Sequence, residues 1–422
     1  MKMPPQAAFT KTGSVLIAIV ALASACAGAA RADVIMDWNV KADAIAAEKK
    51  LLPSTQARTM SMVHVAMFEA VNAIDRRYAP YKLDLAADRS TSREAAAATA
   101  AYNILVSIYP DQKADLDTAL VASLSSIPDT EGKTKGIELG KAAAAGIAAL
   151  RANDGIDAQE TYRPHTTPGA YVPTVVPVSS TTGATTPWVM TTGSQFRPVP
   201  PVALDSETWT RDLNEIRVVG ARNSTVRTAE QTTIGRFWFV VGPPSFNAIV
   251  RQAASAKRMD VVDCARLFAL AEIAANDAIV AVFEAKYHYN FWRPMTAVRN
   301  ADVTQNPATP REASWLPLGE TPMHPEYPCA HCIVSASVST VLQQIVGNEF
   351  GEFSMTSPTA PGVTRKWSKL QDYSDEVANA RIYAGFHYRF SAEVGKDMGR
   401  KIGDLTIATQ LRGLEARATP PR

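Results

Sequence analysis

The chain has 422 residues, which is enough for one large domain or two domains of ordinary size. Its composition, 46% hydrophobic and 20% charged, is that of a packed globular protein. The formal net charge of +2 and the lack of any block of like charges argue against a polybasic nucleic-acid-binding protein.

Residues 1–32 have the features of a secretory signal peptide. Lys2 and Lys11 give a positively charged start, an apolar run follows at 13–30, and a small-x-small cleavage site ends at Ala32. We therefore expect an exported protein, secreted or periplasmic. Two alternatives remain open: the run could be a membrane anchor, although it is short for a span, and Cys26 could be the lipidated cysteine of a lipoprotein. No later segment is long and apolar enough to span a bilayer.

The first half of the mature chain is predicted to be helical. Apolar residues recur at helical spacing in three segments, 59–77, 92–109 and 134–153. Proline or glycine follows each of them, as expected at helix ends. Residues 161–205 then lose this periodicity and are dense in Pro, Thr and Gly, which predicts a long connecting loop. This loop separates an N-terminal half, 33–160, from a C-terminal half, 206–422.

The C-terminal half also reads as helical, with a second Pro-rich connection at 305–328. The predicted helices in this half are 228–239, 260–289, 329–346, 367–384 and 389–411. Strand signals are weak throughout, so the sequence predicts an all-α fold built from helical bundles.

A pair of cations stands near the end of the helix predicted at 260–289. Lys286 and Arg293 are seven residues apart, about two helical turns, which would place both on one side of a helix that ends near Pro294. Two converging cations suit a multiply charged oxyanion, because Arg offers a planar fork and Lys a movable point charge. The alternative is a pair of solvated helix charges.

Two histidines stand in comparable settings further along the chain. His331 falls in the first turn of a helix predicted to begin after Pro328, where free backbone N–H groups favour an anion. His387 follows Arg381 by six residues, so on an ideal helix the two would lie about 120° apart. They can meet one ligand only if the helix breaks at Gly385. Taken singly, each histidine could equally be a surface or core residue with no chemical role.

The order and spacing of these segments resemble a known family. Lys-x6-Arg-Pro, Pro-x-x-His and Arg-x5-His together are similar to the vanadium-dependent haloperoxidases and the related type-2 phosphatidic acid phosphatase superfamily. Three further segments, 63–74, 196–201 and 227–238, resemble the secreted chloroperoxidase-type branch. The resemblance implies an all-α fold of the vanadium chloroperoxidase and acid phosphatase type, with Pro-rich connecting loops.

Family membership also implies a cofactor and a role for each residue of the constellation. Vanadate would be the cofactor, and His387 would ligate vanadium or, in a phosphatase, become the phosphorylated nucleophile. Lys286, Arg293 and Arg381 would neutralise the oxygens of the anion, and His331 would be the acid–base group.

The implied function is a haloperoxidase that oxidises a halide with hydrogen peroxide, with a small organic molecule as acceptor. A phosphatase acting through a phosphohistidine and an inactive binding homologue are the alternatives. His324 lies where relatives carry an aromatic residue or a second histidine, and histidine favours bromide slightly. It could instead be a simple loop histidine. The sequence leaves a homo-oligomer open and predicts no nucleic-acid partner.

This chain departs from the family pattern at three positions. The usual Pro-Ser-Gly-His has Cys329 and Ala330 at its centre, so a weaker S–H donor and an intact backbone N–H are expected to contact the anion. Ser391 replaces an Asp that often orients the ligating histidine, which predicts a weaker orienting group.

Three cysteines remain after cleavage of the first 32 residues. Cys329 and Cys332 form a C-x-x-C at a predicted helix start, and we expect them to pair in an oxidising compartment, which leaves Cys264 outside the disulfide. A redox-active role lacks the surrounding βαβ pattern, and zinc binding would need ligands that one helical turn cannot supply.

Overall fold

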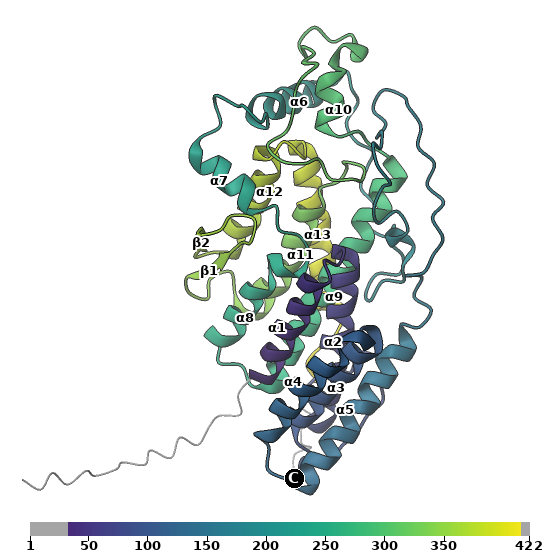
Figure 1. The fold of residues 1–422 in the computed structure, drawn as a ribbon, viewed down its shortest axis with the longest axis vertical. Coiled ribbons are helices and arrows are strands. Elements are labelled where there is room, and N and C mark those ends of the chain that lie inside the picture. Colours follow the sequence, from purple (N-terminus) through teal and green to yellow (C-terminus); the bar gives the residue numbers. More distant parts are fainter. Residues whose placement is uncertain (1–32, 415–422) are drawn as a thin grey trace, which may run out of the picture.

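The computed structural model describes residues 33–414, which form a mostly helical body (Figure 1). The prediction of an all-α fold is confirmed. The N-terminal half contains α1 (Asp33–Glu48), α2 (Pro53–Ile74), α3 (Arg93–Ile108), α4 (Lys113–Ser125) and α5 (Glu131–Leu150). The C-terminal half contains α6 (Glu207–Val219), α7 (Ala229–Phe237), α8 (Asn247–Ala256), α9 (Val261–Tyr289), α10 (Pro294–Arg299), α11 (Ala330–Val346), α12 (Leu370–Tyr383) and α13 (Arg389–Thr409).

The two halves share one hydrophobic core that runs along α9. This helix is apolar on all sides, as expected of a helix surrounded by others, and it packs against α2 of the N-terminal half and α11 of the C-terminal half. Its N-terminus is capped by Asp260, whose carboxylate accepts the backbone N–H groups of Val262 and Asp263. Lys286 therefore lies in the last turn of a largely buried helix.

Helices α11 and α13 pack closely enough to fix the start of α11. The closest approach is at Gly399 of α13, where a Cβ would lie 2.2 Å from the carbonyl oxygen of Ile333. Any larger residue would push the helices apart, and α11 begins with Ala330 and His331 only half a turn away. This packing holds the N-terminus of α11 in place.

The connecting segment 161–205 is irregular, apart from a short 3₁₀ turn, and runs along the side of the molecule (Figure 1). One buried carboxylate of α9 holds it: Asp277 accepts the backbone N–H groups of Trp188, Val189 and Met190 at 2.6, 2.9 and 2.8 Å. Burial raises the pKa of Asp277 to about 6.

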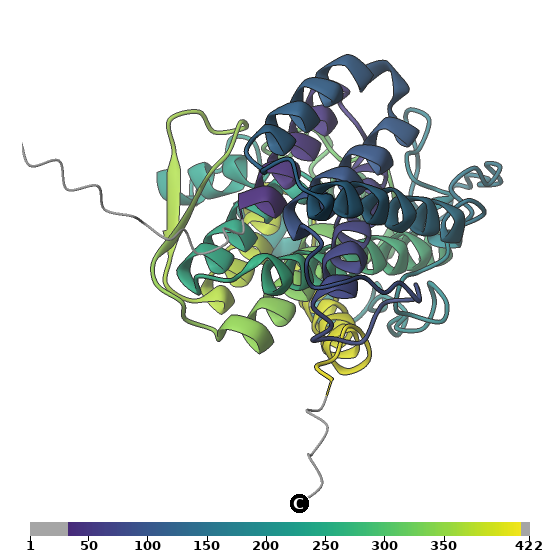
Figure 2. The same cartoon turned by 90° about the horizontal axis from the view of Figure 1, so that it is seen from below.

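Some elements differ from the sequence-based prediction. The helices α1, α4, α6, α8 and α10 were not predicted, and an antiparallel hairpin of β1 (Phe353–Thr356) and β2 (Thr364–Trp367) lies at the side of the helices (Figure 2). Within residues 33–414, no helix is both long and apolar enough to cross a membrane. The predicted signal peptide lies outside the described residues.

Candidate active site

Three cations from separate segments are buried together. Lys286 lies in the last turn of α9, Arg293 precedes α10 and Arg381 lies in the last turn of α12, and each residue is at most 2% exposed. We call these three residues the cation cluster. The Lys286 ammonium donates to the backbone oxygens of Pro325 and Glu326 at 3.0 and 2.7 Å. These acceptors are neutral, so they satisfy hydrogen bonds without compensating the charge.

The two cations of the first motif do not share a helix, and that prediction is wrong. α9 ends at Tyr289, and Asn290 takes a left-handed conformation with φ of 48° that turns the chain. Arg293 is therefore the extended N-cap residue of α10, with Pro294 in the first helical position. The turn still brings its guanidinium to the segment that Lys286 contacts, because Arg293 Nε donates to the carbonyl oxygen of His324 at 2.8 Å.

Arg381 and His387 meet because α12 stops between them, as predicted. α12 ends at Tyr383, and Gly385 has φ of +78°. A Cβ at Gly385 would also lie 2.5 Å from the carbonyl oxygen of Gly220, so glycine is required by both conformation and space. The Arg381 guanidinium donates to the carbonyl oxygen of Trp238, which comes from the segment after α7.

The positive charge at this site is not balanced. Among the described residues, Glu326 supplies one buried carboxylate next to the three cations of the cluster. In addition, the Nε–H of Arg381 has no hydrogen-bond partner. Burial, reinforced by Arg293, lowers the pKa of Arg381 to about 9, and burial lowers that of Arg293 to about 10. Burial and the neighbouring arginines hold the pKa of Lys286 well below its usual range. Such a group of buried cations favours a bound anion.

The imidazole of His387 is oriented by a carboxylate that the sequence analysis missed. Nδ1 of His387 donates to Oε1 of Glu326 at 2.8 Å, and the same oxygen accepts the backbone N–H of Tyr388 at 3.0 Å. With the proton on Nδ1, the lone pair of Nε2 faces Arg293, whose Nη1 lies 3.3 Å away. His387 therefore presents an unprotonated nitrogen beside the cation cluster.

Glu326 also takes the orienting role that the sequence analysis assigned to Ser391. That serine stands where relatives often carry an orienting Asp, and it was expected to orient the histidine weakly. In the fold, a full carboxylate reaches the ring from the segment before α11 instead. Burial raises the pKa of Glu326 to about 7, while Lys286 and Arg293 oppose this effect. The prediction of a weaker orienting group is therefore wrong.

His331 lies in the first turn of α11 and is partly open to a cavity. Its Nε2 donates to the carbonyl oxygen of Val240 at 3.0 Å, which leaves the lone pair on Nδ1. Burial, followed by the charge of Arg381, holds the pKa of His331 well below its usual value. The ring is therefore neutral near pH 7 and can accept a proton.

His324 joins the same group rather than lying in a free loop. Its ring packs edge-on against Phe283, with centroids 5.1 Å apart, and its Nδ1 lies 3.0 Å from Nη2 of Arg293. Burial and Arg293 hold the pKa of His324 well below its usual value.

The Pro-Cys-Ala-His segment differs from the prediction in one respect. Cys329 and Cys332 form the expected disulfide, and Cys264 is buried in α9. The sulfur of Cys329 accepts the backbone N–H of Cys332 at 3.3 Å and carries no proton, so it cannot donate to an anion. The predicted S–H contact from Cys329 is therefore wrong. Ala330 does border the cavity.

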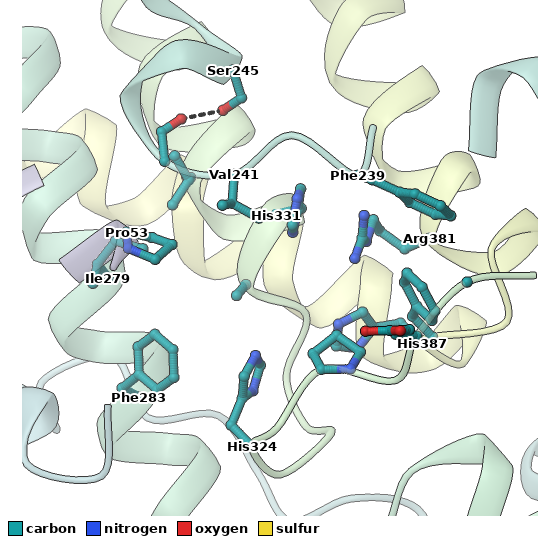
Figure 3. A pocket seen from close by; sticks show the side chains of 17 residues that line it. Pro53, Phe239, Val241, Ser245, Ile279, Phe283, His324, His331, Arg381 and His387 are labelled. Carbon is teal, nitrogen blue, oxygen red and sulfur yellow. Dashed lines mark hydrogen bonds between the residues drawn. The ribbon is translucent and has the colours of Figure 1, made fainter. Parts of the chain in front are cut away.

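A cavity of about 520 Å³ opens onto these groups (Figure 3). His324, His331, Arg381 and His387 line its floor, and Figure 3 shows the last three close together. Arg293 instead borders a neighbouring cavity of about 280 Å³ on the other side of residues 319–322. The five predicted residues thus converge on one place, with the two histidines and Arg381 open to the larger cavity.

Comparison with known proteins agrees with this architecture. Residues 266–415 match the family described as the VCPO second helical-bundle domain. The vanadium chloroperoxidase of Curvularia inaequalis is 25% identical over an alignment of 468 residues that covers 82% of this chain and 76% of that protein.

Solved structures extend the likeness in fold. The first bacterial vanadium-dependent iodoperoxidase has a TM-score of 0.79 at 23% identity, covering 92% of this chain and 99% of that one. A bacterial vanadium-dependent chloroperoxidase in its holo form has a TM-score of 0.64 at 17% identity, covering 84% and 91%. By sequence over residues 266–415 and by fold over nearly its whole length, the chain is similar to the vanadium haloperoxidases.

Proposed function

We propose that this protein is an exported haloperoxidase that holds vanadate at His387 and oxidises a halide with hydrogen peroxide. The observation that carries the proposal is the excess of buried positive charge around the unprotonated Nε2 of His387, at the floor of an open cavity. The named relatives are vanadium chloroperoxidase and iodoperoxidase, which supports this chemistry here.

The residues present fit a vanadate ion. Arg381 Nε is an orphaned donor, the cation cluster lacks sufficient counter-charge, and His387 offers a nitrogen lone pair. Lys286, Arg293 and Arg381 would hold the oxygens, and the backbone N–H of Ala330 at the start of α11 would add a neutral donor. When bound, vanadate supplies a Lewis acid that activates peroxide toward halide without a change of metal redox state.

The protein's own part of the reaction is proton transfer and charge stabilisation. His331 accepts a proton from hydrogen peroxide at Nδ1, since Nε2 is committed to Val240, and returns it to the departing oxygen. The cation cluster stabilises the negative charge of the anion throughout. The sum is H2O2 + X⁻ + H⁺ → HOX + H2O, with a halide oxidised and peroxide reduced.

We further propose bromide as the favoured halide. His324 supports this choice, because its ring lines the cavity floor between Phe283 and Arg293. Export is supported by the Cys329–Cys332 disulfide, which is a bond typical of oxidising compartments.

A phosphatase is the second candidate, because the same site would hold phosphate and the Glu326–His387 pair could present Nε2 as a nucleophile. The test compares two reactions of the purified protein. With orthovanadate, peroxide and bromide, we expect bromination of phenol red that is absent without vanadate. Hydrolysis of p-nitrophenyl phosphate in the absence of vanadate would favour the phosphatase instead.

A third outcome would identify an inactive binding homologue. If neither reaction occurs and vanadate does not raise the unfolding temperature, the proposed cofactor site is wrong. Specific binding should be visible, since a ligand present at 100 times its Kd stabilises the folded state by about 2.7 kcal/mol.

The disulfide leads to a prediction of its own. The Cys329→Ser, Cys332→Ser double variant should lose about 2 kcal/mol of unfolding free energy, the chain-entropy value for so short a loop. It should keep or raise its peroxidase rate, because a serine hydroxyl at 329 can donate to the anion where the disulfide sulfur cannot. Urea unfolding and initial bromination rates measure the two effects. A stable but inactive double variant would show that the disulfide itself is needed.

A further inference from the structure

The cavity above the floor is much more apolar than peroxide and halide require. Its walls are built mainly from aromatic and aliphatic side chains, namely Phe239, Val241, Ile279, Phe283, Val334 and Phe386. Away from Ile279 and Phe283, Figure 3 shows His331, Arg381 and His387 close together. An apolar wall offers no hydrogen bonds to a hydrated ion, so it adds nothing to the binding of a halide.

Two of the aromatic side chains in the cavity wall contact residues of the anion site directly. The Phe386 ring lies under the Arg381 guanidinium at 4.9 Å, and Phe283 touches His324. Phe239 extends the same surface outward, with its ring 5.4 Å from that of Phe386. A flat ring placed between these walls would therefore lie directly above the anion site. A volume of about 520 Å³ is within the range of cavities that bind small organic ligands.

We propose that this cavity binds a neutral, electron-rich aromatic acceptor of one or two rings, such as a phenol, and that halogen is transferred to it before leaving the protein. This inference rests on the proposed function and names its acceptor class. The balanced step is Ar–H + X⁻ + H2O2 + H⁺ → Ar–X + 2 H2O. The O–O bond of peroxide breaks, halide is oxidised, a C–X bond replaces a C–H bond, and the ring proton is released.

A neutral acceptor fits better than a carboxylate. The cations near the cavity are those of the anion site itself, so an acceptor with a carboxylate would compete with vanadate for them. Glu320 is exposed and also lines the cavity, which adds repulsion for any anionic acceptor.

The test places a neutral polar group at the mouth of the cavity, because a negative charge there would also repel the halide and vanadate. Val241 is 40% exposed, outside the cation cluster, and lines the cavity, so Val241→Asn should fold normally. With 2-phenylphenol as the acceptor and bromide as the halide, we expect KM for the phenol to rise at least tenfold. The conversion of iodide to triiodide, which needs no organic acceptor, should remain within twofold of wild type. The matched control is Val121→Asn, at a 68% exposed valine of α4, which should change neither quantity.

Two further readouts separate this inference from the proposed function. Calorimetry without vanadate should show saturable binding of 2-phenylphenol to wild type and at least tenfold weaker binding to Val241→Asn. The ratio of ortho to para bromination should differ between wild-type enzyme and free hypobromous acid. An unchanged KM, or an ortho-to-para ratio equal to that of the free reagent, overturns the inference. If the wild-type protein forms no triiodide from iodide and peroxide with vanadate present, the proposed function is refuted instead. The calorimetry would then still decide whether the cavity binds the phenol.

Discussion

His387→Ala should abolish vanadate binding and peroxidase activity together, whereas His331→Ala should keep binding and lose turnover. His387 is the residue that offers an unprotonated nitrogen to the anion site, so its removal would take away the nitrogen proposed to hold the vanadate. His331 has its Nε2 hydrogen-bonded to Val240 and acts by proton transfer at Nδ1, and the loss of such a group typically costs a factor of about 10² to 10⁴ in rate.

The measurements are a vanadate titration followed by calorimetry and initial rates at saturating vanadate. His331→Ala should bind vanadate within about fivefold of wild type, because the cation cluster and His387 stay in place. Circular dichroism of both variants checks that the fold is kept. An equal loss of vanadate affinity in the two variants would contradict the roles assigned to them.

Glu326→Gln should weaken vanadate binding about 10- to 100-fold, the usual cost of removing a group that orients a metal-ligating histidine. The glutamine can still accept the Nδ1 hydrogen bond, but it no longer increases the basicity of His387. Phosphate binding should not weaken, because removing a buried negative charge leaves the site more positive. The ratio of vanadate to phosphate affinity therefore separates an electronic role from a structural one.

A second variant makes this test sharper. Ser391 is buried, and its hydroxyl contributes to lowering the pKa of Glu326. Adding Ser391→Asp to Glu326→Gln returns a carboxylate to the position where relatives often have one, and it should restore most of the vanadate affinity. Equal losses of vanadate and phosphate binding in Glu326→Gln, without rescue, would show that Glu326 only supports the local fold.

The sequence predicted the helices that bury a regular apolar face and missed those whose burial depends on distant partners. The bounds of α3, α9 and α11 agree with the prediction to within a residue or two. In α4, a single residue, Leu116, is buried, so its pattern gives little apolar signal. What failed was the argument that put Arg293 on the same helix as Lys286, because it took Pro294 as the stop and missed the left-handed Asn290.

The cationic and histidine side chains of the site could be predicted from the sequence. The order of the cations and histidines and the break at Gly385 were readable from the chain. The carbonyl groups of Trp238 and Val240 could not be predicted, because every residue type has a backbone carbonyl and the sequence does not show which one will accept a hydrogen bond. Glu326 was visible as an acidic residue between His324 and His331, but nothing in its spacing showed that it would turn toward His387.

The floor of the cavity and part of its mouth come from different stretches of the chain. The charged groups all lie between positions 286 and 387, while Pro53 of α2 and Val241 before α8 help to form the mouth. Divergence in the earlier stretches can therefore alter which molecule enters without disturbing the reactive centre. Homologues that keep the same charged groups can accordingly evolve new acceptors, and a chimaera that exchanges residues 33–260 would take from the donor the part of its selectivity that Pro53, Phe239 and Val241 determine.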